Sequence, residues 1–165
     1  MDRICRLRMA VKGIGEFMAV LEKNQIITGE KFENKEALFK YVGKIALENG
    51  IIDSVDGFVE GLFEREHEMS TCFEDGIAIP HCRNASVKTA AIFIVRSMNA
   101  VEWDAQHNQA DFIVLLAVPM GENDTHINLL SCVARKLVDE TFKKKILALT
   151  DAGELYLSFN EVITK

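Results

Sequence analysis

The chain has 165 residues, of which 48% are apolar and 27% charged, and its formal net charge at pH 7 is −6. This length suits one domain with a sizeable core, and this balance is that of an ordinary globular protein. The negative charge argues against nucleic acid as the main partner, because phosphate binding needs clustered positive charge. No apolar run approaches the roughly 20 residues that span a bilayer, so we expect no membrane insertion.

Residues 1–19 are expected to form an N-terminal extension or helix ahead of a single domain over residues 20–165. Apolar residues there, such as Ile4, Leu7 and Val11, follow helical spacing, and Met18 is an alternative start. The segment lacks the continuous apolar stretch of a secretory signal, and the cysteines form no CxxC pair. We therefore expect reduced thiols and a cytoplasmic location.

Two helices are predicted next in the chain. The first covers 34–49, with Asn34 as the N-cap and Gly50 as the left-handed stop. The second runs from Ser54 to about Glu66, with an apolar stripe along one face.

Dense apolar runs then replace the helical period and predict buried strands. These runs are "GIAIP" (76–80), "TAAIFIVRS" (89–97) and "ADFIVLLAVP" (110–119), and "VEW" (101–103) is expected to be an edge strand. Further helices are predicted from about Thr125, over "TFKKKILALT" (141–150) and over "DAGELYLSFNEVI" (151–163). This order of elements predicts an α/β fold: a single domain with a mixed central β-sheet flanked by helices on both faces.

His81 is the sharpest candidate for chemistry, because it directly follows a predicted strand and Pro80. In α/β proteins a strand end presents reactive groups to a crevice, and the proline stiffens the backbone before the imidazole. Histidine titrates near neutrality, so an unprotonated ring nitrogen is available for attack. An inert surface histidine beside a turn is the alternative for so short a motif.

Three other residues could act with this histidine. His126 lies at the start of a predicted helix, where a neutral imidazole can hydrogen-bond an oxyanion; otherwise it is a solvated first-turn residue. Arg65 offers a planar fork of donors that suits phosphate or carboxylate; otherwise it pairs with Glu64 or Glu66 on its own helix. Asp75 could orient an imidazole or serve only as a turn residue. His67 and His107 lie in polar runs and are expected to be solvated.

Two blocks of sequence carry a family resemblance. The run "REHEMSTCFEDGIAIPH" (65–81) resembles the active-site signature of EIIA domains of the fructose/mannitol type (type 2), part of the bacterial phosphoenolpyruvate-dependent sugar phosphotransferase system. The run "DFIVLLAVPMGENDTHINLLSCVARKL" (111–137) is similar to the family's other motif: an apolar strand, a proline and a histidine that opens a helix. The resemblance covers roughly residues 20 to 163.

The resemblance implies a phosphotransferase that passes a phosphoryl group from protein to protein without cofactor or metal. His81 would accept the group from phospho-HPr and pass it to a cysteine of an EIIB domain, with a membrane EIIC component served indirectly. Arg65 would bind the phosphoryl group and His126 would stabilise it, and Ser70, Thr71 and Asp75 match other positions of the site. Such transfer depends mostly on positioning and charge stabilisation.

Two departures from the family pattern concern this site. Relatives usually have glycine where this chain has Cys82, and often where it has Glu74. The added bulk and charge bear on partner choice and rate.

Two other readings stay open. One is a regulatory, nitrogen-type module of the same fold, phosphorylated on His81 but acting by protein binding. The other is a zinc or thiol enzyme built on Cys72, His81, Cys82 and His126, although the usual zinc-ligand spacings are missing.

Overall fold

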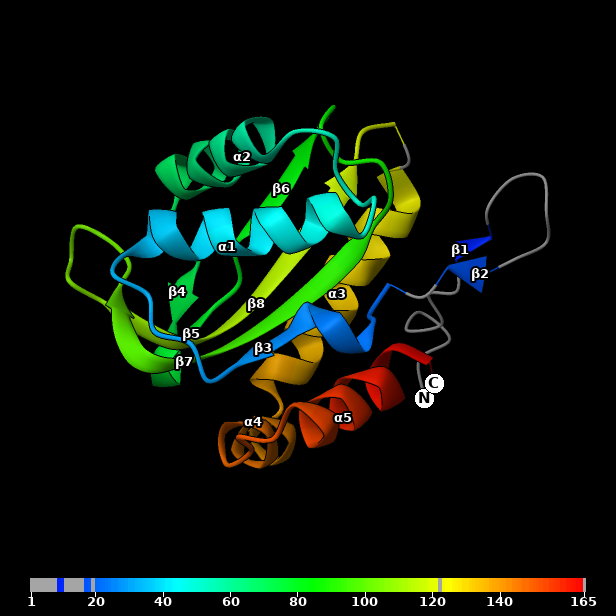
Figure 1. Ribbon diagram of the computed structural model, residues 1–165. Coiled ribbons are helices and arrows are strands. Elements are labelled where there is room, and N and C mark those ends of the chain that lie inside the picture. The colour runs from blue at the N-terminus through cyan, green and yellow to red at the C-terminus, as the bar shows by residue number, and fades with distance from the viewer. Residues whose placement is uncertain (1–8, 11–16, 19, 122, 165) are drawn as a thin grey trace.

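The computed structural model describes residues 9–10, 17–18, 20–121 and 123–164. In the domain that follows β1 and β2, a mixed sheet lies between two layers of helices (Figure 1). One face carries α1 (Lys35–Glu48) and α2 (Val55–Glu68). The other carries α3 (Asn123–Val138), α4 (Glu140–Leu147) and α5 (Ala152–Thr164). The predicted α/β fold class is confirmed.

The sheet has six strands, in the order β3 (Ile26–Thr28), β7 (Ala91–Glu102), β8 (Gln109–Pro119), β5 (Ile77–Ala78) and β4 (Cys72–Phe73), with β6 (His81–Asn84) also paired to β8. β7 and β8 are antiparallel, whereas β3 runs parallel to β7, and β5 and β6 run parallel to β8. The three predicted strands are confirmed as β5, β7 and β8.

The prediction of a separate edge strand at 101–103 is wrong. Val101 and Glu102 continue β7 after an irregularity that follows Arg96, and they pair with Ala110 and Gln109 of β8. β3, β4 and β6 were not predicted, because strands of three, two and four residues are too short to show a period.

The helix boundaries follow from capping residues. Asn34 accepts a hydrogen bond from the Ala37 amide at 2.8 Å and so caps α1. Gly50, with φ of 72°, provides the left-handed stop. Ser54 caps α2 by accepting from the Gly57 amide at 3.0 Å, and α2 then continues to Glu68. Both predicted helices are confirmed, the second with an extra half turn.

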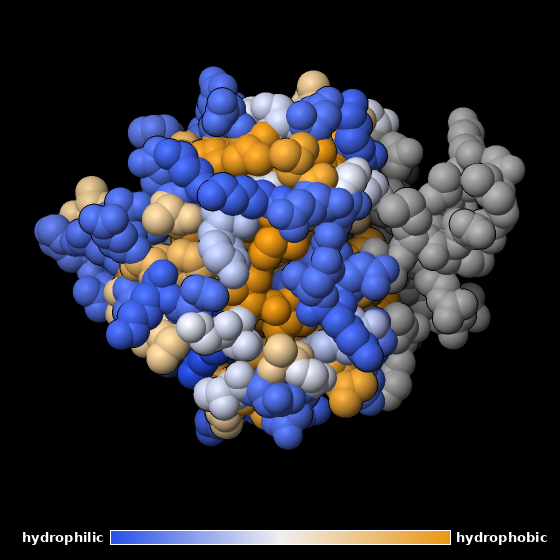
Figure 2. Space-filling view, in the orientation of Figure 1, coloured by the Kyte–Doolittle hydropathy of each residue, from blue (hydrophilic) through white to orange (hydrophobic). Residues whose placement is uncertain are grey.

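Alternation along the strands divides the core into two layers. Phe93, Val95 and Leu115 pack with α1 and α2, whereas their neighbours Ile92 and Ile94 pack with α3, α4 and α5. Figure 2 shows the molecule with α1 and α2 in the upper part of the view and α4 and α5 in the lower part; hydrophilic side chains dominate this surface and hydrophobic ones show between them. Each large apolar side chain buried in this way contributes about 1.5–3 kcal/mol.

Of the two alternatives predicted for residues 1–19, a helix is not formed at the described positions, whereas an extension ahead of a domain over residues 20–165 stays a prediction. β1 (Met9–Ala10) and β2 (Phe17–Met18) pair antiparallel rather than forming a helix, and Ile4, Leu7 and Val11 lie outside the described residues. No helix in the described part of the chain is long and apolar enough to cross a membrane.

The cysteines were expected to be reduced. Cys72 and Cys82 are free thiols, but Cys132 is disulfide-bonded, so this expectation is wrong for Cys132.

Candidate active site

β5 and β6 form one strand interrupted at Ile79 and Pro80. The register against β8 is the same on both sides of the break, since Ala78 pairs with Ile113 and His81 with Leu116. The Pro80 carbonyl still accepts a hydrogen bond from the Leu116 amide at 3.0 Å. His81 is therefore the first residue of a resumed strand rather than a residue beyond a strand end, and the sheet fixes its backbone.

The hydrogen bonds of the His81 ring define its protonation state. Nδ1 lies 3.1 Å from the carbonyl oxygen of Ile79, and Nε2 lies 2.9 Å from Nε of Arg65. Because a carbonyl only accepts and an arginine Nε–H only donates, Nδ1 carries the proton and Nε2 presents its lone pair. Burial and then the charge of Arg65 lower the pKa of His81, against the opposing effect of the Ile79 carbonyl. The ring is therefore neutral at pH 7.

Arg65 is held over this ring by α2. Its second bond, from a terminal guanidinium nitrogen to the Met69 carbonyl at 2.7 Å, fixes the side chain across the end of the helix. It bonds to His81 and Met69 rather than to Glu64 or Glu66, which was the alternative expected from the sequence.

A glycine face brings α2 close to β6. A Cβ at Gly61 would lie 2.5 Å from both Sγ of Cys82 and Nδ2 of Asn84, and Asn84 also donates to the Gly57 carbonyl at 2.8 Å. Gly57, Gly61 and Arg65 are spaced by four residues and so lie along one side of the helix. This spacing is a signal that the sequence analysis missed.

Cys82 does not add bulk beside the imidazole as expected. It is fully buried, and its sulfur lies against Gly61, under α2. Burial raises the pKa of its thiol to about 12. Glu74, the other departure from the family pattern, is exposed on the short 3-10 turn η3 (Glu74–Gly76).

Ser70 and Thr71 anchor the segment that leads into β5. The amide of Thr71 donates to Glu66 at 3.1 Å, its hydroxyl donates to the same carboxylate, and Nε1 of Trp103 donates to that carboxylate at 3.1 Å. Ser70 donates to Asp104 at 2.6 Å, and this bond is the main cause of the lowered pKa of Asp104. Glu66 is thus a structural residue of the site that the sequence analysis treated only as a partner for Arg65.

The hydrogen bonds of the imidazole nitrogens go to Ile79 and Arg65 rather than to Asp75. Asp75 adopts a left-handed conformation with φ of 63°, and its carboxylate binds Nζ of Lys143 on α4 at 2.8 Å. The orienting role expected of Asp75 is filled by the Ile79 carbonyl. Gly76 follows with φ of 75°, where a Cβ would lie 2.9 Å from the Asp111 carboxylate, so this turn requires glycine.

His126 lies in the first turn of α3, as predicted, and its side chain lies outside what the structure describes. α3 begins shortly after β8 ends at Pro119, and Pro119 is paired with Asn84 of β6. The backbone therefore brings this helix start to the end of the sheet where β6 runs.

The thiol and zinc alternatives gain no support from the geometry. Burial, followed by Asp104 and Glu66, raises the pKa of Cys72 to about 11, so both free thiols stay protonated and are weak nucleophiles. Among the described residues, no group of three or more His, Cys, Asp and Glu side chains is placed to hold a metal ion.

The site is thus a neutral, half-buried histidine that lies under an arginine at a break in a mixed sheet. A small α/β domain with such a site is suited to nucleophilic chemistry at one imidazole. The family model described as "Phosphoenolpyruvate-dependent sugar phosphotransferase system, EIIA 2" matches residues 19–162. The chain belongs to this family.

Curated relatives agree with this assignment. The chain is 27% identical over 137 residues to a multiphosphoryl transfer protein of Escherichia coli O6:H1; the match covers 82% of the chain but only 16% of that protein. It is 29% identical over 114 residues to the fructose-specific EIIA component of Haloferax volcanii, covering 68% of this chain and 74% of that one. The chain therefore spans a small fraction of the multiphosphoryl transfer proteins.

Solved structures share the fold. The nitrogen regulatory protein IIA-Ntr of Neisseria meningitidis is 28% identical with a TM-score of 0.74, covering 84% of this chain and 95% of that one. Enzyme IIA mannitol of Escherichia coli, in its complex with phosphorylated enzyme IIB mannitol, is 18% identical with a TM-score of 0.69, covering 86% and 97%.

Proposed function

We propose that this protein is a phosphocarrier that accepts a phosphoryl group from phospho-HPr on Nε2 of His81 and passes it to a cysteine of an EIIB domain. The observation that carries this proposal is the pair of hydrogen bonds on the ring, from Arg65 to Nε2 and from Nδ1 to the Ile79 carbonyl. They leave Nε2 with a lone pair and half-bury it beside a cation, as attack on phosphorus requires.

In the proposed transfer, the lone pair of Nε2 forms a bond to phosphorus while the bond between phosphorus and the donor breaks and its electron pair stays with the donor. The ring gains positive charge, and the Ile79 carbonyl stabilises it by keeping its hydrogen bond to Nδ1–H. Passing the group to the acceptor thiolate reverses these changes, so His81 returns to its starting state.

Arg65 has two positions in this scheme. At rest its Nε occupies the lone pair of Nε2, so it must release that nitrogen when phosphorus arrives and then donate to the phosphoryl oxygens. His126, in the first turn of α3, is proposed to donate to the same oxygens, where helix-start amides also favour an anion.

The proposed partners need an accessible, partly apolar rim around His81. Met69, whose carbonyl holds Arg65, is 70% exposed and supplies such a surface. The related enzyme IIA mannitol is seen in complex with phosphorylated enzyme IIB mannitol, which supports an EIIB domain as the acceptor here.

The test is phosphoryl transfer from radiolabelled phosphoenolpyruvate through enzyme I and HPr. We expect the native chain to be labelled, and to lose the label when a cognate EIIB domain is added. His81→Ala should not be labelled, whereas His67→Ala, which removes an exposed histidine of α2, should be labelled as the native chain is. Normal labelling of the His81 variant would overturn the proposal.

A regulatory role is the second candidate, and the likeness to the nitrogen regulatory protein of Neisseria meningitidis favours it. In that case His81 would be phosphorylated in the same assay, but no EIIB domain would remove the label. The phosphorylated and unphosphorylated forms would instead differ in affinity for a protein partner.

A further inference from the structure

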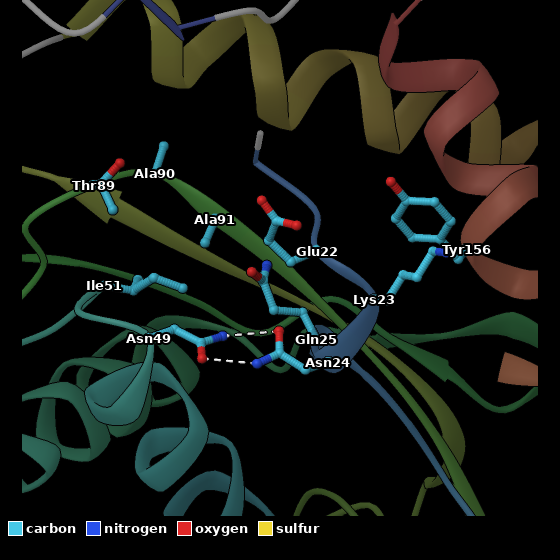
Figure 3. A pocket seen from close by; sticks show the side chains of 10 residues that line it. All are labelled: Glu22, Lys23, Asn24, Gln25, Asn49, Ile51, Thr89, Ala90, Ala91 and Tyr156. Carbon is cyan, nitrogen blue, oxygen red and sulfur yellow. Dashed lines mark hydrogen bonds between the residues drawn. The ribbon is translucent and has the colours of Figure 1, made fainter. Parts of the chain in front are cut away.

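A cavity of about 510 Å³ opens beside the edge strand β3, among the elements drawn in Figure 3. Its walls come from the 3-10 turn η2 (Lys23–Gln25), the end of α1, the start of β7 and one side chain of α5. This volume is in the range of sites for small ligands. The lining residues are Glu22, Lys23, Asn24, Gln25, Asn49, Ile51, Thr89, Ala90, Ala91 and Tyr156.

Gln25 gives this cavity a buried polar group. The residue is only 1% exposed, and its Nε2 donates to the carbonyls of Val20 at 3.0 Å and Ile92 at 2.7 Å. Because both partners are acceptors, the amide nitrogen must face them, and this fixes the orientation of the carboxamide. Its Oε1 has no hydrogen-bond partner in the described part of the chain.

A buried acceptor without a donor is costly, so a donor from outside the chain would be bound with a gain. Figure 3 shows the Gln25 carboxamide near Glu22 and Ala91, apart from the amide pair of Asn24 and Asn49. That pair is reciprocal, at 2.8 and 3.0 Å, so these two amides already hold each other. Within the described part of the chain, Oε1 of Gln25 therefore remains an unused acceptor for a molecule that enters the cavity.

The mouth of the cavity carries both signs of charge. Glu22 and Lys23 are adjacent and exposed, and Nζ of Lys23 lies 5.9 Å from the centre of the Tyr156 ring. Ile51 and Ala91 are buried and make the inner wall apolar. The cavity thus offers a carboxylate and a buried acceptor on one side, an ammonium group on another, and an apolar wall. These groups complement a molecule that has an ammonium group, a carboxylate and a short apolar part.

This cavity is separate from the His81 site. Ile92, whose carbonyl holds Gln25, is paired with Leu116, and Leu116 is paired with His81. Two strand spacings amount to ~10 Å, so a ligand could bind here without displacing Arg65 from the imidazole. Nothing in the proposed phosphoryl transfer uses these residues.

We propose that the cavity binds a small zwitterion, a free α-amino acid. Its ammonium group donates to Oε1 of Gln25 and to the Glu22 carboxylate, its carboxylate accepts from Lys23, and its side chain lies against Ile51 and Ala91. An uncharged polyol would satisfy Gln25 but would leave both charges at the mouth without a partner.

The experiment titrates the unphosphorylated full chain with each common L-α-amino acid at millimolar concentration, followed by amide NMR shifts and calorimetry. N-acetylated amino acids and glycerol are the matched probes, since the first lack the ammonium group and the second lacks both charges. We expect at least one amino acid to bind and to shift the amides of Ala91 and Ile92, with neither control probe binding. Absence of binding by every amino acid, or equal binding of glycerol, would overturn the proposal.

Variants at the exposed mouth avoid disturbing the fold. Glu22→Gln and Lys23→Met should each weaken binding about tenfold, the size of one charge-assisted hydrogen bond, whereas the exposed control Glu33→Gln should bind as the native chain does. Native affinity in both mouth variants would reject the assignment. His81→Ala should bind the amino acid normally, so a failure here is distinct from a failure of the phosphocarrier proposal.

Discussion

The segment that leads into His81 is held from two sides of the molecule, by α2 and by α4. On the α2 side, Arg65 contacts the reacting nitrogen and Glu66 binds both the amide and the hydroxyl of Thr71. On the α4 side, Lys143 binds Asp75 and so holds only the η3 turn. Both contacts are polar, but only the first reaches the imidazole.

Because only the α2 side contacts the imidazole, the two sides should influence the strand that carries His81 in different ways. Changes on the α2 side should alter the charge, position and proton affinity of the nucleophile directly. Changes on the α4 side can act only through the backbone between Asp75 and His81, which the ladder to β8 already holds in register. Substitutions on the α2 side should therefore slow the labelling of His81 more than substitutions on the α4 side.

The largest effect is expected for Arg65→Met. Removing the guanidinium leaves the phosphoryl oxygens without their nearest cation, and losses of this kind slow reactions by about 10²–10³. Arg65→Lys should recover only part of the rate, because an ammonium group lacks the planar fork. The measurement is the rate of labelling by phospho-HPr, with the exposed Lys44→Met as a control for charge. A native labelling rate in Arg65→Met would show that the contacts of α2 influence the chemistry of His81 no more than those of α4.

Gly61→Ala should have the second largest effect, because the added Cβ would push α2 away from β6. Its Cβ would lie 2.5 Å from Cys82 Sγ and from Asn84 Nδ2, and such overpacking costs about 1–3 kcal/mol. Helix propensity returns up to about 1 kcal/mol in any Gly→Ala change, so Gly57→Ala, whose Cβ would be 3.3 Å from Ser86, should be close to neutral.

Urea unfolding of the two glycine variants measures the difference between their free energies of unfolding. Adding Cys82→Ala to Gly61→Ala should restore part of the lost stability, since it removes the sulfur from the contact. Equal stability of the two glycine variants would show that the close approach of α2 is not needed.

Glu66→Gln should have an intermediate effect. The carboxamide oxygen can still accept from the amide of Thr71 and from Nε1 of Trp103, while its NH2 group can only donate to the Thr71 hydroxyl, so these bonds remain but lose the strength that the carboxylate charge gives them. The expected cost is about 1–2 kcal/mol in the free energy of unfolding, with slower labelling of His81. Glu60→Gln, an exposed change on the same helix, is the control and should match the native chain in both measurements.

The dependence of the labelling rate on pH should be smaller than the effects of these substitutions, and it should follow the titration of the His81 imidazole. Since the pKa of His81 is lowered from 6.5, mainly by burial and then by Arg65, the labelling rate should stay level as pH falls to 6.5 and decline only below it. Between 6.5 and the lowered pKa the unfolded chain binds more protons, so stability also falls with acid in this window.

NMR titration of the His81 ring checks this directly. Arg65→Met should raise the pKa of His81, because the positive charge that opposes protonation is removed. A pKa of 6.5 or above in the native chain would contradict the resting geometry described here.

The regular elements and the His81–Arg65 pair could be predicted from the sequence. Asn34, Gly50 and Ser54 mark helix ends by local chemistry, and β7 and β8 are long enough to show themselves as apolar runs. For His81 and Arg65 the predictive signal was a motif of neighbouring residues, "REHEMSTCFEDGIAIPH", whose order alone carries the resemblance.

What escaped prediction depends on contacts between distant residues. Glu66 meets Trp103 across 37 positions, and Gln25 meets Ile92 across 67, and no local pattern marks either pair. β4 and β6 have two and four residues, so they exist only because β5 and β8 lie beside them. The sequence could not decide between the two roles expected of Asp75, imidazole orienter or turn residue, for the same reason, because its partner Lys143 is on α4.

Lys143→Met should have the smallest effect, although the lysine is itself buried. Its side chain is 6% exposed, but those of Asp75 and Glu140 are 51% and 66% exposed, so both carboxylates can return to water when the ammonium is removed. The methionine keeps the apolar stem in place. We expect labelling of His81 within about threefold of native, the range of a solvated ion pair.

Asp75→Asn is the matched variant for the same contact, because asparagine tolerates the left-handed backbone at this position and loses only the charge. In the labelling of His81 it should match Lys143→Met, and the double variant should match either single one, since all three remove the ion pair between Lys143 and Asp75. Only the variants that lack Lys143 also lose its bond to Glu140, which lies on α4 itself and does not touch the η3 turn. If Lys143→Met instead slowed labelling as much as Arg65→Met, the η3 turn would control the nucleophile, and α2 and α4 would have equal influence on the chemistry.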